Sequence, residues 1–136
     1  MKKILIIVGS ASCVHDDLAV LHNYADYDVM AIGLDTAEYS GRVDHVATLH
    51  SYELPDFWER REAVHGNQDY ETHSHEAFEH WVNRLWPYEP PSGSSAMLGV
   101  EAGLGMGYKK IILAGCPLAA DSRYNEFHPG LSLIHI

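Results

Sequence analysis

Residues 92–118 constrain the fold of this chain more than any other segment. The pattern predicts a loop of small residues, a helix over 95–106, a glycine stop at Gly107 and a buried strand over 111–115. Ser95, Gly99 and Gly103 are spaced four residues apart, so one face of the helix carries almost no side chains. Such a helix can pack unusually close to its support, and the small-residue loop leaves free backbone N–H groups at its N-terminus.

The rest of the chain alternates between short apolar runs and helical segments. Continuous β-branched runs are typical of strands that are buried on both faces. Because alternating strands and helices fold into parallel sheets with helices on both faces, we expect a three-layer, Rossmann-like α/β fold. The expected elements are strand 4–8, helix 16–24, strand 28–33, strand 44–50 and helix 54–64.

The middle of the chain, residues 67–91, is rich in histidine and closed by Pro87, Pro90 and Pro91. Residues 69–73 fit a short strand, and residues 75–84 fit either a helix or an exposed insertion. We expect one domain over residues 1–130 with a histidine-rich insertion near 67–91.

Charge and composition exclude several classes of function. The chain has 136 residues, which is enough for one domain, and its 9 Lys and Arg against 19 Asp and Glu give a formal net charge of -10. Such an acidic protein repels nucleic acid and anionic membranes. No apolar run is long enough to span a bilayer. Cys13 and Cys116 are far apart, which favours reduced thiols and a cytoplasmic protein over a structural disulfide.

Ligands of parallel sheets bind at the carboxyl ends of the strands. Gly9, Ser10 and Ser12 follow the first strand, where they form either a turn that admits a nucleotide or a plain strand-to-helix turn. Neither a dinucleotide fingerprint nor a Walker A sequence is present. Asp35 follows the second strand and fits either a ribose contact or an Asx turn.

The later strand ends supply the other candidates. His50 ends the third expected strand, where it fits general acid–base chemistry, a phosphate contact or a helix cap. Gly115 ends the last strand. A loop before the helix N-terminus is suited to an anion, and it consists of Ser92, Gly93, Ser94 and Ser95.

Four histidines of the middle segment could form a metal site, but their spacing matches no metal-binding template. We therefore favour a polar surface segment and assign no metal ligand; these histidines are His65, His73, His75 and His80. The adjacent Arg60 and Arg61 could grip a phosphate, although a solvated helix face is the commoner arrangement. The sequence identifies no cofactor and leaves the oligomeric state open.

Two motifs resemble a known group of proteins. Residues 2–12 resemble the strand and glycine-rich loop of bacterial sialyltransferases and of the 6-hydroxymethylpterin diphosphokinase-like family. Residues 92–118 are similar to the second motif of that group. Uncharacterised phage-borne relatives resemble the chain most closely, through His50, the Trp58–Arg61 segment and Gly115–Pro117. The resemblance covers nearly the whole chain.

The resemblance implies that the two loops bracket a nucleotide, which is usually a cytidine nucleotide in the sialyltransferases. The first loop would line the phosphate side, and the loop 92–95 would close around the ligand. Ser10, Ala11 and Cys116-Pro117 stand where the group has asparagine, proline and an acidic residue. The general-base histidine of the sialyltransferases lies downstream of the last strand, and His128 is the candidate for that role here.

Residues 131–136 resemble a translated sequencing adapter, and the alternative is a genuine last strand. We expect the natural protein to continue past about Gly130.

Three classes of function remain open from the sequence. The first is binding of a nucleotide or nucleotide-sugar, with glycosyl- or phosphoryl-transfer catalysed by His50 or His128. The second is a non-enzymatic phage accessory protein that binds a partner. The third is a metal-dependent hydrolase that uses the histidine-rich segment.

Overall fold

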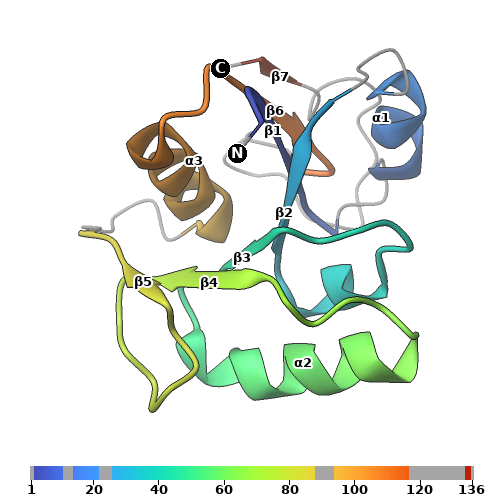
Figure 1. Ribbon diagram of the computed structural model, residues 1–136. Coiled ribbons are helices and arrows are strands. Elements are labelled where there is room, and N and C mark those ends of the chain that lie inside the picture. The colour runs from blue at the N-terminus through green and yellow to red at the C-terminus, as the bar shows by residue number, and fades with distance from the viewer. Residues whose placement is uncertain (1, 11–13, 22–25, 88–93, 117–133, 136) are drawn as a thin grey trace.

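A computed structural model describes residues 2–10, 14–21, 26–87, 94–116 and 134–135 (Figure 1). Its strands form one sheet in the order β5-β4-β3-β2-β1-β6-β7, in which β1 to β6 are parallel and β7 is antiparallel to β6. The strands are β1 (Ile4–Val8), β2 (Asp28–Ile32), β3 (His45–Ala47), β4 (Glu71–Ser74), β5 (Arg84–Leu85), β6 (Lys110–Ala114) and β7 (Ile134–His135).

Helices cover both faces of the sheet, which confirms the predicted three-layer α/β architecture (Figure 1). Helix α3 (Ser95–Met106) packs on one face, against alternate residues of the central strands such as Leu5, Met30 and Leu113. The opposite face is covered by α1 (Val14–Val20), α2 (Leu54–Ala63) and the 3-10 helix η2 (Leu34–Glu38), and a second 3-10 turn, η3 (Ser51–Glu53), precedes α2.

Helix α3 packs closely on the sheet through its glycines, as the sequence predicts. A Cβ on Gly99 would lie 3.0 Å from Met30 Sδ, and a Cβ on Gly103 would lie 2.8 Å from Leu5 Cδ2. Gly107 ends the helix in the left-handed conformation, with φ of 96°. Ser94 occupies the N-cap position, but its side chain makes no capping hydrogen bond to the helix.

The third strand is shorter than predicted, because side chains take over the backbone donors beyond it. Strand β3 ends at Ala47 rather than at residue 50. The Leu49 N–H donates to Ser95 Oγ, and the His50 N–H donates to Thr48 Oγ1. The chain therefore leaves the sheet early, and His50 lies in the connection to η3 rather than at a strand end.

The first helix also differs from its prediction. It begins at Val14 rather than at Asp16, so both Asp16 and Asp17 lie in its first turn. Residues 22–24, where the prediction extended it, lie outside the described residues.

The histidine-rich middle segment is part of the sheet, which corrects the prediction of an insertion over 67–91. Strands β4 and β5 add to the sheet beside β3, and residues 75–83 form the connection between them without a helix. His73 is fully buried in β4. His80 is exposed, as expected for a surface segment.

Several predictions concern the ends of the chain and the membrane. Residues 134 and 135 pair with Leu113 and Ile112 of β6, while the proposed non-native origin of 131–136 stays a prediction. None of the helices in the described part of the chain is long and apolar enough to cross a membrane. Ser12, Ser92, Gly93 and His128 lie outside the described residues.

Candidate functional site

The strand order places a topological switch point between β1 and β6. From β1 the chain builds the sheet outwards through β2, β3, β4 and β5, and it then returns to add β6 on the other side of β1. Helix α1, which precedes β2, and helix α3, which precedes β6, lie on opposite faces of the sheet. Open α/β sheets bind ligands at such a switch point, beyond the carboxyl ends of the strands.

Two glycines keep the backbones close at this switch point. A Cβ on Gly9 would collide with the carbonyl oxygen of Gly115 and would lie 2.7 Å from Cys116 Sγ. Gly115 has a φ of 68°, and a Cβ there would lie 2.7 Å from the carbonyl oxygen of Gly9. Only glycine fits at either position without moving backbone.

A cavity of about 470 Å³, which we call the carboxyl-edge cavity, lies at this point. It collects every predicted site residue that the structure describes, from the ends of β1, β2 and β6, from the connection after β3 and from the start of α3. Those residues are Gly9, Ser10, Asp35, His50, Ser94, Ser95 and Gly115.

The start of α3 gives this cavity its positive partial charge. The Ser94 carbonyl accepts the N–H groups of Met97 and Leu98, whereas the N–H groups of Ser95 and Ala96 come too early in the helix to have a partner within it. Ser94, Ser95 and Ala96 all line the cavity. Ser95 Oγ accepts the Leu49 N–H at 3.0 Å, which holds the loop after β3 against this helix start.

Two acidic residues also line the cavity. Asp35 and Glu53 both line it, and among the described residues no lysine or arginine does. Asp35 accepts a hydrogen bond from the exposed Arg60 at 2.9 Å. His50 is exposed and lines the same cavity, and its side chain does not cap the following helix. The cavity thus offers backbone donors suited to an anion and carboxylates suited to hydroxyl groups.

Asp17 is a buried part of this site that the sequence pattern did not identify. Its carboxylate accepts the Gly115 N–H at 2.9 Å, although the two residues are far apart in sequence. The Gly115 N–H is therefore engaged, and Gly115 contributes space to the cavity rather than a donor. The sequence indicated Asp17 only as an acidic residue in the first turn of a helix.

A second hollow continues the carboxyl-edge cavity between α1 and η2. It measures about 400 Å³ and shares Gly9, Ser10 and Asp35 with the first. His15, Glu38 and Tyr39 line its far side. A ligand with two parts therefore has room on both sides of the β1 loop.

Arg61 is buried against η2 and the loop that joins it to β3, so both predicted roles for it are wrong. Its side chain is 1% exposed and donates to the carbonyl oxygens of Ala37, Tyr39, Gly41 and Asn67, and to the Asn67 side chain. It neither faces solvent nor reaches the cavity. It fixes the segment that follows η2, and η2 carries Asp35.

A chain of hydrogen bonds crosses the amino edge of the sheet, on the face that α3 covers. The Trp86 indole N–H donates to His73 Nδ1 at 2.9 Å, and His73 Nε2 lies 3.0 Å from His45 Nδ1. His45 Nε2 lies 3.0 Å from the Tyr108 hydroxyl, which donates to Asp28 at 2.6 Å. Because indole only donates and carboxylate only accepts, both histidines carry their proton on Nε2.

Burial keeps both histidines of this chain neutral. Burial, with smaller contributions from His45 and Arg84, lowers the pKa of His73 to about 3. Burial also lowers the pKa of His45, although Glu71 and Asp28 oppose the change. Burial first, and then the hydrogen bond to Asp28, raise the pKa of Tyr108.

His45, Glu71 and His73 are the described residues whose ligand atoms lie close enough to hold a metal ion, all within 4.8 Å of one another. Of the four histidines that the sequence singled out, only His73 belongs to this group. Glu71 and His73 are two apart on one strand, which places them on one face of the sheet, but only the pairing of β3 with β4 adds His45.

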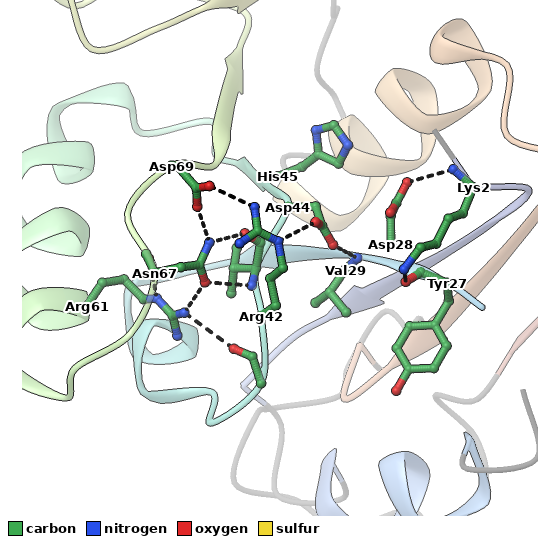
Figure 2. A network of polar contacts seen from close by, with 12 residues as sticks. Lys2, Tyr27, Asp28, Val29, Arg42, Asp44, His45, Arg61, Asn67 and Asp69 are labelled. Carbon is green, nitrogen blue, oxygen red and sulfur yellow. Dashed lines mark hydrogen bonds and ion pairs between the residues drawn. The ribbon is translucent and has the colours of Figure 1, made fainter. Parts of the chain in front are cut away.

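An acidic cavity of about 400 Å³ opens beside this group, and we call it the amino-edge cavity. Figure 2 shows Asp28, Asp44 and Asp69 near His45, with Arg42 bridging Asp44 and Asp69. The same cavity is lined by Glu71, Arg84, Met106 and Tyr108.

Comparisons with protein-family models, with curated proteins and with solved structures return no match.

Proposed function

We propose that the carboxyl-edge cavity binds a nucleotide or nucleotide-sugar. The observation that carries the proposal is that residues from the ends of β1, β2 and β6, from the connection after β3 and from the start of α3 line one cavity at the switch point of a parallel sheet. The resemblance to the sialyltransferase group supports a cytidine nucleotide as the first ligand to test.

The polarity of the cavity supports an assignment of ligand parts to its walls. The N–H groups of Ser95 and Ala96, which have no partner within the helix, favour a phosphate at the start of α3. Asp35 and Glu53 suit ribose or sugar hydroxyls, because a carboxylate accepts the hydrogen bonds that hydroxyls donate. The hollow beside Tyr39 gives space for the second part of a nucleotide-sugar.

The transfer chemistry is proposed for His50, which is exposed and lines the cavity. A neutral imidazole there would accept the proton of an acceptor hydroxyl as that oxygen attacks the transferred group, and the nucleotide would depart with the bonding electrons. His128 remains the alternative base, and a cytoplasmic location remains a prediction.

Calorimetry with CMP, CTP and a CMP-sugar tests binding. We expect the full chain to bind at least one of these ligands with a dissociation constant below 1 mM, which is about -4 kcal/mol or better. No heat of binding with any of them at millimolar concentration would contradict the proposal.

Ser94→Asp tests the phosphate wall. Aspartate caps a helix about as well as serine, so the fold should persist. The added charge should repel a phosphate and weaken CMP binding at least tenfold, while cytidine without phosphate should bind equally well to both proteins. Equal CMP affinity in the wild type and in Ser94→Asp would show that the phosphate does not bind at the start of α3.

Asp35→Ala and Arg60→Ala form a matched pair for the hydroxyl wall. Each breaks the same exposed ion pair, but only Asp35 lines the cavity. We expect Asp35→Ala to weaken CMP binding several-fold and Arg60→Ala to leave it nearly unchanged. Equal effects would mean that the ion pair, rather than the carboxylate, matters.

The third class of function also has a structural observation in its favour, namely the group His45, Glu71 and His73. It differs from the predicted histidine cluster in two of its three residues.

A further inference from the structure

We propose that His45, Glu71 and His73 form a binding site for a zinc-class transition-metal ion, and that the Trp86 indole opposes its occupancy. This site lies at the amino edge of the sheet and does not depend on the proposed nucleotide cavity at the carboxyl edge.

Two of the three donor separations are close to those of a tetrahedral zinc site, and all three donor atoms lie within 4.8 Å of one another. His45 Nδ1 and His73 Nε2 are 3.0 Å apart, and Glu71 Oε1 lies 3.5 Å from His73 Nε2. Ligands at about 2.1 Å in tetrahedral geometry are about 3.4 Å from each other. Two histidines and one glutamate are also the ligand set of zinc sites that keep a fourth position open.

The open position would face the amino-edge cavity, because His45 and Glu71 line it while His73 lies behind them. Asp28, Asp44, Asp69 and Glu71 line the same cavity, with Arg84 as the cation among its lining residues. This excess of carboxylates favours a cation over an anion.

His45 has the surroundings of a metal ligand. Its Nε2–H donates to the Tyr108 hydroxyl, which in turn donates to Asp28. Metal-bound histidines almost always donate their second ring N–H in this way, which fixes the tautomer and orients the ring. Nδ1 of His45 therefore presents its lone pair towards the position of the ion.

Glu71 contributes a buried oxygen that is poorly satisfied. Oε1 lies 2.9 Å from Arg84 Nε, but it has no hydrogen bond of good geometry. The Arg84 side chain is half exposed, so it can move aside when the oxygen takes a metal ion.

His73 has its proton on the nitrogen that would bind the metal. Trp86 donates to Nδ1, and this keeps the proton on Nε2, where it fills the space between the two rings. Metal binding requires the proton to move to Nδ1, which then faces the indole N–H. Both histidines stay neutral and no proton is released, but the Trp86 hydrogen bond is lost. Trp86 thus weakens the site.

Zinc titration of the full chain, stripped of metal with a chelator and without an affinity tag, tests the proposal. We expect one zinc ion to bind. His45→Gln and Glu71→Gln should each weaken binding at least tenfold. Trp86→Phe should strengthen it about tenfold, because the ring is kept and the opposing donor is removed. His80→Gln, at an exposed histidine outside the group, is the matched control and should bind as the wild type does.

A nitrogen-15 spectrum of the histidine rings provides a readout that does not depend on the stability of the variants. On addition of zinc to the wild type, His73 should change from the Nε2–H to the Nδ1–H tautomer. The absence of stoichiometric binding at 100-fold molar excess would overturn the proposal. So would unchanged affinity in His45→Gln, or an affinity lost only in His80→Gln.

Discussion

The two ends of α3 lie at two cavities of opposite character. Its N-terminus lies at the carboxyl-edge cavity, among serines and glycines whose backbone approaches closely. Met106 and Tyr108, at its C-terminal end about 18 Å away, line the amino-edge cavity among carboxylates and a histidine. Because the partial charge of a helix is positive at its N-terminus and negative at its C-terminus, one helix favours an anion at one cavity and a cation at the other.

The difference shows that backbone shapes one cavity and side chains shape the other. Small residues at the carboxyl edge leave the backbone as the source of hydrogen-bond donors. At the amino edge, polar side chains form hydrogen bonds directly to one another in a continuous chain. This chain runs through Trp86, His73, His45, Tyr108 and Asp28. The stability of the first region should therefore be sensitive to added side-chain volume. The stability of the second should be sensitive to changes of protonation.

The largest effect is expected for Arg61→Gln, which removes the guanidinium group that holds η2 and the loop joining it to β3. It would leave the buried carbonyl oxygens after η2 without their donor, so we expect the free energy of unfolding to fall by about 3 kcal/mol. Urea denaturation measures this loss. Arg60→Gln is the matched control on the exposed side of the same helix and should cost less than about 1 kcal/mol. Similar losses in Arg61→Gln and Arg60→Gln would mean that the buried hydrogen bonds of Arg61 do not contribute to the free energy of unfolding.

Gly9→Ala should have the next largest effect. The new methyl group would collide with the backbone at Gly115, and overpacking of this kind costs about 2 kcal/mol. Gly99→Ala is the control, because its methyl group would meet the flexible end of Met30 at 3.0 Å and the helix itself gains from alanine. Thermal melts should show a clear loss for the first variant and little change for the second. Equal loss would remove the distinction between backbone contact and side-chain contact.

A smaller effect, confined to the amino edge, is expected from pH. The pKa of His73 is lowered to about 3 in the folded protein, whereas the unfolded histidine titrates near 6.5. The unfolded chain therefore binds a proton first, and stability is lost as the pH falls from about 6.5 towards 3. In the presence of a chelator, the wild type should lose more stability between pH 7 and pH 5 than His73→Gln does. Parallel losses would place the titrating group elsewhere.

The fold could be predicted from the sequence because its patterns are local. Each pattern depends on residues of one element, and each element is found as predicted. Examples are the β-branched run of 4–8, the glycine spacing of 95–106 and the helix end at Gly107. The carboxyl end of β3 could not be predicted, because it depends on contacts made by the residues that follow the strand. The Leu49 N–H donates to Ser95 Oγ, and the His50 N–H donates to Thr48 Oγ1.

The two cavities were not equally predictable. The carboxyl edge followed from a general rule, since all parallel strands end at one edge whatever their order. The amino-edge group required the pairing of β3 with β4 and the position of Tyr108, which lies 63 residues from His45 in sequence. The burial of Arg61 likewise depends on loops from separate parts of the chain.

Backbone amide mapping during titration with CMP tests the central proposal most directly. The account predicts that the largest shifts arise at Gly9, Ser10, Ser94, Ser95 and Ala96, with little change at His45 and Glu71. Shifts confined to the amino edge, or no shifts at millimolar CMP, would contradict it.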